Sequence, residues 1–193
     1  MTSGSRLLIA AVALSLAQIG FLGWIIAGRA AILRDGTEVL LRIRPIDPRD
    51  LLRGDYVALG YDIGSVPAEL VVNRPVGGST TEDGPIYVRL APGDDGHWQA
   101  VSASLGAPAP ALPAGQVDIR GKITSGWSLA DGAELNPDYG IGRFYLPEGE
   151  GLAIQNDLRE RPFSMKVAVA EDGTAQIKAL LDGETVLFEE PLY

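Results

Sequence analysis

The sequence of 193 residues contains no cysteine, one histidine and three lysines. Without cysteine the chain has no disulfide and no thiolate chemistry. A structural zinc site is excluded as well, because such a site takes four cysteine or histidine ligands. The net charge of −9 argues against a nucleic-acid-binding surface, which needs a basic patch.

Common catalytic and cofactor-binding motifs are also missing from the sequence. There is no GxGxxG after a strand, no Walker loop and no GxSxG elbow. Any Ser-His-Asp triad would have to use His97, which lies in a turn that enters a strand. Asp94 and Asp95 could contact calcium, but the spacing of an EF-hand loop is absent. We expect no cofactor and no metal, and the sequence assigns no catalytic residue.

A serine–lysine dyad needs no histidine and stays open at this point. Ser164 and Lys166 share one face of the alternating segment FSMKVAVA, and Lys122 lies in IRGKITS. We interpret the two lysines as solvated strand residues. A hydroxyl within hydrogen-bonding reach of a lysine would favour an enzyme instead.

One long apolar run lies near the N-terminus. Residues 7–27 form a stretch of 21 residues without a charge. As a helix this stretch spans about 30 Å, which is the hydrocarbon thickness of a bilayer. A cleaved signal peptide, the alternative, has a shorter apolar core and a small-residue cleavage site, for which GRA at 28–30 is poor. The run therefore predicts a single transmembrane anchor.

The orientation of the anchor follows less directly. Positive charge lies on both sides, with Arg6 before the run and Arg29 and Arg34 after it. Long domains translocate largely regardless of charge, so we expect residues 1–6 in the cytoplasm and the following domain outside. Trp24 stands where an interfacial aromatic is expected. This places the protein in the inner (cytoplasmic) membrane, with a periplasmic or otherwise extracytoplasmic domain.

Small residues repeat along one face of the predicted anchor helix. Ala10, Ala13, Ala17 and Gly20 follow each other at spacings of three and four. Such a face lets a second helix approach closely. The spacing predicts a membrane partner, although alanine is also common in bacterial anchors.

After the anchor the sequence changes to a period of two, which predicts a mainly β fold. Val39, Leu41 and Ile43 alternate with more polar positions, typical of a half-buried strand. The Asp-Gly pairs in EDGT and LDGE predict tight hairpins. We expect residues 28–34 to be a linker and residues 35–193 to be an antiparallel, barrel-like β domain. Further strands are predicted over 55–63, 86–90, 98–102, 116–124, 142–146, 163–170, 175–181 and 185–189, and short helices over 47–54 and 151–159.

The densest group of charges lies in PRDLLRGDYVALGYDI. Arg49, Asp50, Arg53 and Asp55 occur within seven residues. The Asp-Pro pair before them suits the start of a helix, and Asp50 favours the N-terminus of that helix. Gly54 suits its end. The segment therefore predicts one helical turn followed by a strand.

A second polar cluster contains Arg143, Tyr145 and Glu148, in YGIGRFYLPEGEG. If the two segments are neighbours in the fold, Asp55 could pair with Arg143, and Arg53 with Glu148. The two tyrosines of the first segment, Tyr56 and Tyr61, face opposite sides of a strand, so at most one is expected in the core. The segments could be structural corners, a shared binding groove or, least supported, a catalytic site.

The segment GDYVALGY matches the motif that names the GDYXXLXY family at Gly54, Asp55, Tyr56, Leu59 and Tyr61. PIDPRDLLR and YGIGRFYLPEGEG are similar to other recurring segments of that family. The resemblance implies a membrane-anchored bacterial protein without an assigned activity. It also implies a partner, because family members are often encoded beside polytopic membrane proteins.

PRDLLRGDYVAL also resembles the Gly-Asp strand segment of type I signal peptidases, which are anchored and rich in β structure. Those enzymes carry a nucleophilic serine just before the proline turn. Here that region reads RPIDP, and no serine lies between Thr37 and Tyr61. The resemblance therefore implies a similar architecture at most, and fold likeness alone does not establish catalysis.

The sequence predicts a single-pass, non-enzymatic accessory protein whose β-rich domain works with a polytopic membrane protein. The alternatives are a signal-peptidase-like envelope hydrolase and a protein that binds a small envelope ligand in a pocket lined by the motif tyrosines. The residues expected to form the interaction surface are Arg49, Asp50, Arg53, Gly54, Asp55, Tyr56, Leu59, Tyr61, Arg143, Tyr145 and Glu148.

Overall fold

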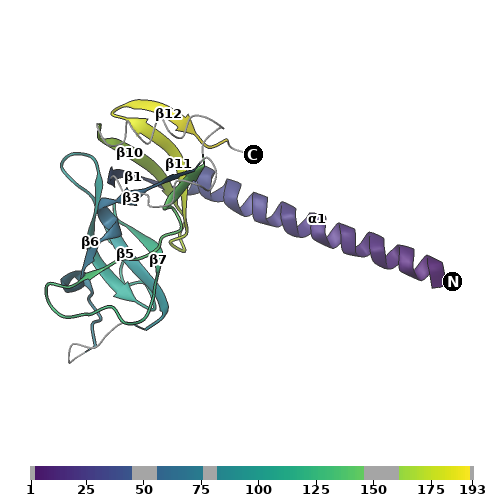
Figure 1. Cartoon of the computed structure of the whole chain (residues 1–193), viewed down its shortest axis with the longest axis horizontal. Helices are drawn as coiled ribbons and strands as arrows, with labels where there is room; N and C mark the ends of the chain where they lie inside the picture. Colours follow the sequence, from purple (N-terminus) through teal and green to yellow (C-terminus); the bar gives the residue numbers. More distant parts are fainter. Residues whose placement is uncertain (1–2, 45–55, 76–81, 146–160, 192–193) are drawn as a thin grey trace.

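The computed structural model describes residues 3–44, 56–75, 82–145 and 161–191. A 33-residue helix, α1 (Ser3–Asp35), projects away from a β domain (Figure 1). None of the apolar window of α1 is buried against the domain. A helix that is apolar on all sides and uncovered by protein has the length and composition of a membrane span.

The β domain consists of antiparallel strands in two main sheets and two short ribbons. One sheet has the strand order β12-β11-β10-β1-β3, and the other has the order β6-β5-β7. The ribbons are β2-β9 and β4-β8. The strands are β1 (Thr37–Arg44), β2 (Tyr56–Ala58), β3 (Gly60–Tyr61), β4 (Val66–Pro67), β5 (Gly84–Pro92), β6 (Trp98–Leu105), β7 (Val117–Ile123), β8 (Glu134–Leu135), β9 (Arg143–Tyr145), β10 (Phe163–Val169), β11 (Ala175–Asp182) and β12 (Thr185–Glu189), with 3₁₀ turns η1 (Asp62–Gly64) and η2 (Ala68–Leu70).

The core fills the space between the two main sheets. Leu41 of β1 and Met165 of β10 lie opposite each other in register and are both buried. They belong to one apolar cluster with Ile86, Leu90 and Ile119 of the other sheet. Each such side chain stabilises the fold by about 1.5–3 kcal/mol when fully buried. The predicted alternation of β1 is confirmed, because Val39, Leu41 and Ile43 are buried in this core.

The two Asp-Gly hairpins are confirmed as the turns β10–β11 and β11–β12. Their glycines, Gly173 and Gly183, have φ values of 83° and 59°, a region that residues with a Cβ avoid. At Gly173 an added Cβ would also lie 2.9 Å from the backbone nitrogen of Arg120. This turn is therefore pressed against β7.

The mainly β, antiparallel fold class is confirmed, while the segment predicted as one strand over residues 55–63 differs in detail. Its described part consists of two short strands, β2 and β3, which are separated at Leu59, and of the start of η1. β2 pairs with β9, whereas β3 pairs with β1, so the chain changes sheets at this point. None of the sheets closes into a barrel among the described strands. The helices predicted over 47–54 and 151–159 lie outside the described residues.

The junction between anchor and domain is short and closely packed. Residues 28–34, expected as a linker, form the last turns of α1, and Gly36 alone separates the helix from β1. The N–H of Gly36 donates to the carbonyl of Ile32 at 2.9 Å. A Cβ on Gly36 would lie 2.5 Å from that carbonyl oxygen, which only glycine avoids without a backbone shift.

Lys178 of β11 ties the same junction to the sheet. Its ammonium donates to the carbonyl of Leu33 at 3.2 Å and to the carboxylate of Glu38 at 2.6 Å. A cation at the last turn of a helix is stabilised by the helix dipole. The hydrogen bond from Lys178 lowers the pKa of Glu38, and the nearby charge of Lys166 lowers it further. The anchor therefore continues into the domain as one body.

Candidate functional site

The two motif segments are neighbours in the fold. In the β2–β9 ribbon Tyr56 lies opposite Tyr145, and Ala58 lies opposite Arg143. We call β2, β3 and the residues from Tyr139 to Tyr145 the motif corner. The two motif segments, which the sequence analysis treated as possible neighbours, are therefore adjacent. Their contact is a strand pairing between residues far apart in the chain.

Two buried tyrosines fasten the motif corner from both sides. The hydroxyl of Tyr61 donates to the carbonyl of Ile141 at 2.8 Å, and the hydroxyl of Tyr139 donates to the carbonyl of Ile63 at 2.9 Å. The rings are 5% and 8% exposed. Burial raises the pKa of both hydroxyls, so both remain protonated donors. Tyr61, the last residue of the motif, is therefore a core residue and not part of an open pocket.

Leu59 occupies the point where the chain changes sheets. Its side chain is buried in the core cluster, and its N–H donates to the carbonyl of Gly142 at 2.9 Å. The hydrogen bond continues the attachment of the first motif segment to the second beyond the β2–β9 ribbon. The remaining predicted site residues lie outside the described residues, and their ion pairs stay predictions: Arg49, Asp50, Arg53, Gly54, Asp55 and Glu148.

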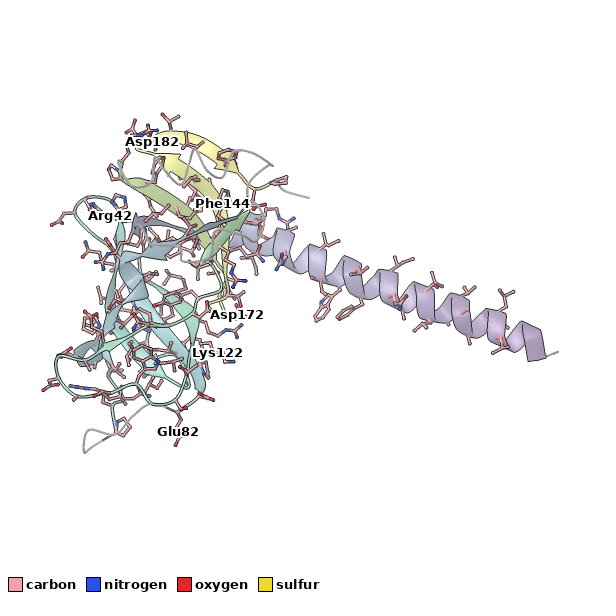
Figure 2. The ribbon with its side chains drawn as sticks, in the orientation of Figure 1. Arg42, Glu82, Lys122, Phe144, Asp172 and Asp182 are labelled. Atoms are coloured by element: carbon pink, nitrogen blue, oxygen red, sulfur yellow. The ribbon has the colours of Figure 1, made fainter. Side chains whose placement is uncertain are left out.

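A small cavity of about 210 Å³ joins the motif corner to the base of α1. Arg29 and Leu33 line it from the helix, and Arg143 and Phe144 line it from β9. Figure 2 shows Phe144 close to the base of the helix. We call this space the corner cavity; its other lining residues are Gly140, Ile141, Ala175, Gln176, Ile177 and Glu190.

A larger groove of about 870 Å³ lies at another face of the same helix base. Ala31, Ile32 and Asp35 of α1 line one side of it. The opposite sides come from β5, β7, the proline-rich loop before β7 and the β10–β11 turn. We call it the anchor groove. Its charged lining residues are Asp35, Asp118, Arg120, Glu171 and Asp172, so carboxylates outnumber cations.

Buried Arg89 fixes the proline-rich wall of the anchor groove. Its guanidinium binds both carboxylate oxygens of Asp118, at 2.8 and 2.9 Å. It also donates to the carbonyls of Ala109 at 2.9 Å and Ala111 at 3.2 Å. Arg89 is 8% exposed, and the hydrogen bond with Asp118 raises its pKa. Ala111 has a φ of 58°, a conformation that costs energy for a residue with a Cβ and that the surroundings must hold in place.

The turn of the β5–β6 hairpin brings Ser164, His97 and Asp95 together. Nε2 of His97 is 2.8 Å from Oγ of Ser164, and Nδ1 is 3.3 Å from Oδ2 of Asp95. Despite this close approach Nδ1 makes no hydrogen bond to Asp95 or to another described residue, so the His–Asp bond of a triad is missing. The backbone N–H of His97 donates to Asp95 at 3.0 Å and lowers the pKa of that carboxyl. The order of groups is that of a Ser-His-Asp triad.

The surroundings of Ser164 favour a structural role. Ser164 is 7% exposed and lies in β10 between its register partners Arg42 and Leu181. A nucleophile needs access to its substrate, and neither the corner cavity nor the anchor groove includes this serine. Arg42 of β1, labelled in Figure 2, binds Asp95 at 2.6 Å and thereby joins the same hairpin to the sheet.

No serine–lysine dyad forms among the described residues. Lys166 lies 3.5 Å from the carboxylate of Glu38, and Lys178 lies 2.6 Å from it. The hydroxyl of Ser164, two residues from Lys166, is bonded to His97 instead. Lys166 and Lys178 are thus engaged by a carboxylate and not by a hydroxyl. Lys122, the other candidate, has no hydroxyl bonded to its ammonium in the described part of the chain.

The profile of the GDYXXLXY protein family matches residues 18–180 of the chain, which is most of its length. The chain belongs to the GDYXXLXY family. Neither the curated proteins nor the solved structures give a match. The matched region of this GDYXXLXY protein begins inside α1 and ends in β11, so it includes the helix base, the whole lining of the anchor groove and all of the corner cavity's lining except Glu190. Membership in this family assigns no activity, so the activity is inferred from the site.

Sequence reasoning found the motif corner but missed the anchor groove of the GDYXXLXY protein. One local signal was available, since Arg89 interrupts the otherwise apolar strand IYVRLAP. A charge within a buried strand requires a partner, and here the partner lies 29 residues away. Its position could not be read from the sequence pattern.

Proposed function

We propose that this GDYXXLXY protein is a single-pass, membrane-anchored accessory protein whose β domain works with a polytopic membrane protein. The observation that carries the proposal is the phase of α1. Ala13 and Ala31 are 18 residues apart, and so are Ala17 and Asp35. At 3.6 residues per turn, 18 residues make about five complete turns. The small-residue face of the anchor therefore leads directly to the helix face that lines the anchor groove.

This alignment supports one continuous docking surface. A partner helix that packs on Ala13 and Ala17 within the bilayer would leave the membrane beside the anchor groove. The groove offers apolar wall residues such as Ile32 and Leu112, together with a carboxylate-rich rim. A connecting segment of the partner with apolar and basic side chains would suit it. The closely packed junction at Gly36 keeps the two parts of the surface in register.

The proposal places the domain outside the inner membrane and treats the protein as non-enzymatic. The position of the domain rests on the tolerance of long domains to positive charge during translocation. The non-enzymatic role is supported by the burial of Ser164 and by the ion pairs of Lys166 and Lys178 with Glu38.

Co-purification from membranes in mild detergent tests the proposal. The full chain with a C-terminal tag is compared with Ala13→Leu/Ala17→Leu, which fills the small-residue face. The matched control is Ala11→Leu/Ser15→Leu, with the same spacing on the opposite side of the helix. We expect mass spectrometry to find one polytopic protein enriched with the wild type and the control, and lost with the first variant.

A second variant tests the motif corner in the same experiment. Asp55→Ala/Tyr56→Ala alters the family motif without changing the anchor. Loss of the same polytopic protein would show that the corner also supports docking. A folded wild-type bait that enriches no membrane protein, or equal enrichment by both helix variants, would contradict the proposed function.

A further inference from the structure

We propose that the corner cavity binds the phosphate of an anionic phospholipid from the membrane in which α1 is anchored. Its lining includes two arginines, Arg29 of α1 and Arg143 of β9, at the end of a helix long and apolar enough to cross a membrane. Guanidinium is the side chain best suited to phosphate, since it offers paired N–H donors and always carries charge.

The depth of Arg29 matches the headgroup layer. The predicted membrane span of residues 7–27 ends at Ala27, and Arg29 follows two residues later. With a rise of 1.5 Å per residue, Arg29 lies about 3 Å beyond the hydrocarbon and Leu33 lies about 9 Å beyond it. The headgroup layer on each side of a bilayer is about 5–8 Å thick. The cavity therefore opens at the level where lipid phosphates are concentrated.

The polar and apolar groups of the corner cavity suit a lipid headgroup. Gln176 supplies an amide for hydrogen bonding, and Leu33, Phe144 and Ile177 complete the wall around the headgroup. The volume of about 210 Å³ fits a headgroup and not a whole lipid. Arg29 makes no ion pair within the described ranges, so its charge is available to a bound anion.

One lining group opposes an anion. Glu190 contributes a carboxylate to the cavity, and only its backbone N–H has a described role, donating to the carbonyl of Lys178 at 2.8 Å. A carboxylate in the lining opposes a bound phosphate by like charge and lowers the affinity for it. This gives the proposal a signature that a merely structural cluster lacks, because removal of Glu190 should tighten binding.

The helix base is basic on the side of the corner cavity and acidic on the side of the anchor groove, as binding of an anionic lipid at the corner cavity requires. Arg29 and Leu33 lie one turn apart on the face of α1 that continues Ala11 and Ser15. The anchor groove, on the other face, is rich in carboxylates and would repel an anionic headgroup. Lipid would thus occupy one side of the anchor and leave the small-residue face to a protein partner.

Binding is measured with the full chain in nanodiscs of phosphatidylcholine, into which phosphatidylglycerol is titrated, with native mass spectrometry counting retained lipids. We expect retention of about one phosphatidylglycerol, weakened about tenfold by Arg29→Ala and largely preserved by Arg29→Lys. The control Arg34→Ala, on the same helix but outside the cavity, should retain lipid like the wild type. Glu190→Gln should retain it more tightly.

Two further arms make each outcome decisive. Glycerol 3-phosphate in solution distinguishes a free phosphate from a lipid; displacement of the lipid at millimolar concentration would overturn the lipid assignment. Arg143→Ala is interpreted only with an unchanged melting temperature, and the proposal stands on Arg29, which is exposed on the helix. Equal retention by Arg29→Ala and Arg34→Ala, or no effect of Glu190→Gln, would overturn it. The assay contains no partner protein, so its result is independent of the proposed function.

Discussion

Tyr61 and Tyr139 each hold the chain segment that carries the other. Tyr61 donates to Ile141, two residues after Tyr139, and Tyr139 donates to Ile63, two residues after Tyr61. The two bonds join segments that are separated by 76 and 80 positions in the sequence. The final tyrosine of the family motif therefore closes the motif corner.

Loss of either hydroxyl should destabilise the domain. Tyr61→Phe and Tyr139→Phe each leave a buried carbonyl without its donor, which costs about 1–2 kcal/mol. The double variant should cost less than the sum, since both bonds hold the same two segments. Urea unfolding in detergent measures the changes, with Tyr87→Phe, half-buried on β5, as the control. Single variants that match this control would contradict the assignment.

Gly36→Ala should disturb the junction between the anchor and the domain. The new Cβ would meet the carbonyl oxygen of Ile32 at 2.5 Å, and relief requires a backbone shift. We expect a lower melting temperature and faster proteolysis near the junction. Gly28→Ala, in the same helix with open space around it, should be neutral or slightly stabilising. Similar behaviour of the two variants would argue against a rigid connection.

Arg89→Met should be among the most damaging single substitutions. It leaves the largely buried carboxylate of Asp118 without a partner, which costs about 3–5 kcal/mol, and it releases the proline-rich loop. Chemical unfolding and limited proteolysis within residues 105–116 report the two effects. Asp118→Asn in the same chain should recover part of the loss. The control Arg120→Met breaks an exposed pair and should cost under about 1 kcal/mol.

Acid should weaken the contribution of Glu38. Its pKa is lowered in the folded protein, so its ionised form favours folding above the ordinary value of 4.5, and this stabilisation is lost as the pH falls through the folded pKa. The melting temperature of the wild type should exceed that of Glu38→Gln at neutral pH, with the difference shrinking below about pH 4.5. Glu189→Gln on β12 serves as the control. A difference that is constant with pH would exclude the charged contact as its source.

Ser164 should be inert as a nucleophile. A fluorophosphonate probe labels activated serines, and we expect no adduct at Ser164, because this side chain is enclosed in the sheet. Ser164→Ala should cost about 1 kcal/mol through the lost bond to His97. Peptide mass spectrometry, with a known serine hydrolase in the same tube, checks the labelling. A stoichiometric adduct at Ser164 would reopen the hydrolase interpretation.

Local patterns were sufficient for much of the fold. The alternation of Val39, Leu41 and Ile43 predicted β1, and the Asp-Gly pairs predicted the C-terminal hairpins. These features depend on residues within a few positions of each other, where sterics and burial leave few choices. Strands of two residues, such as β4 and β8, are too short to show any period.

The candidate site was less accessible to sequence reasoning, because its contacts are long-range. His97 and Ser164 are 67 residues apart, and their pairing depends on how the β5–β6 hairpin packs on β10. The anchor groove is assembled from the end of α1, the strands β1, β5, β7 and β10, the proline-rich loop and the β10–β11 turn, so no local motif marks it. The sequence alone did not predict that the two segments of the motif corner are neighbours, because the pairing of β2 with β9 is set by the sheets around it.

Because α1 continues into β1 without a flexible linker, the length of the anchor helix sets the direction that the domain faces around the helix axis. A flexible linker would let the domain turn freely above the membrane, but here each residue inserted near Gly28 would rotate the domain by about 100° and raise it by about 1.5 Å. One inserted alanine would point the anchor groove away from a partner on the small-residue face. Seven would restore the direction, to within about 20°, at a height increased by about 10 Å. Complex formation should therefore vary with the helical phase of the insertion more than with its length.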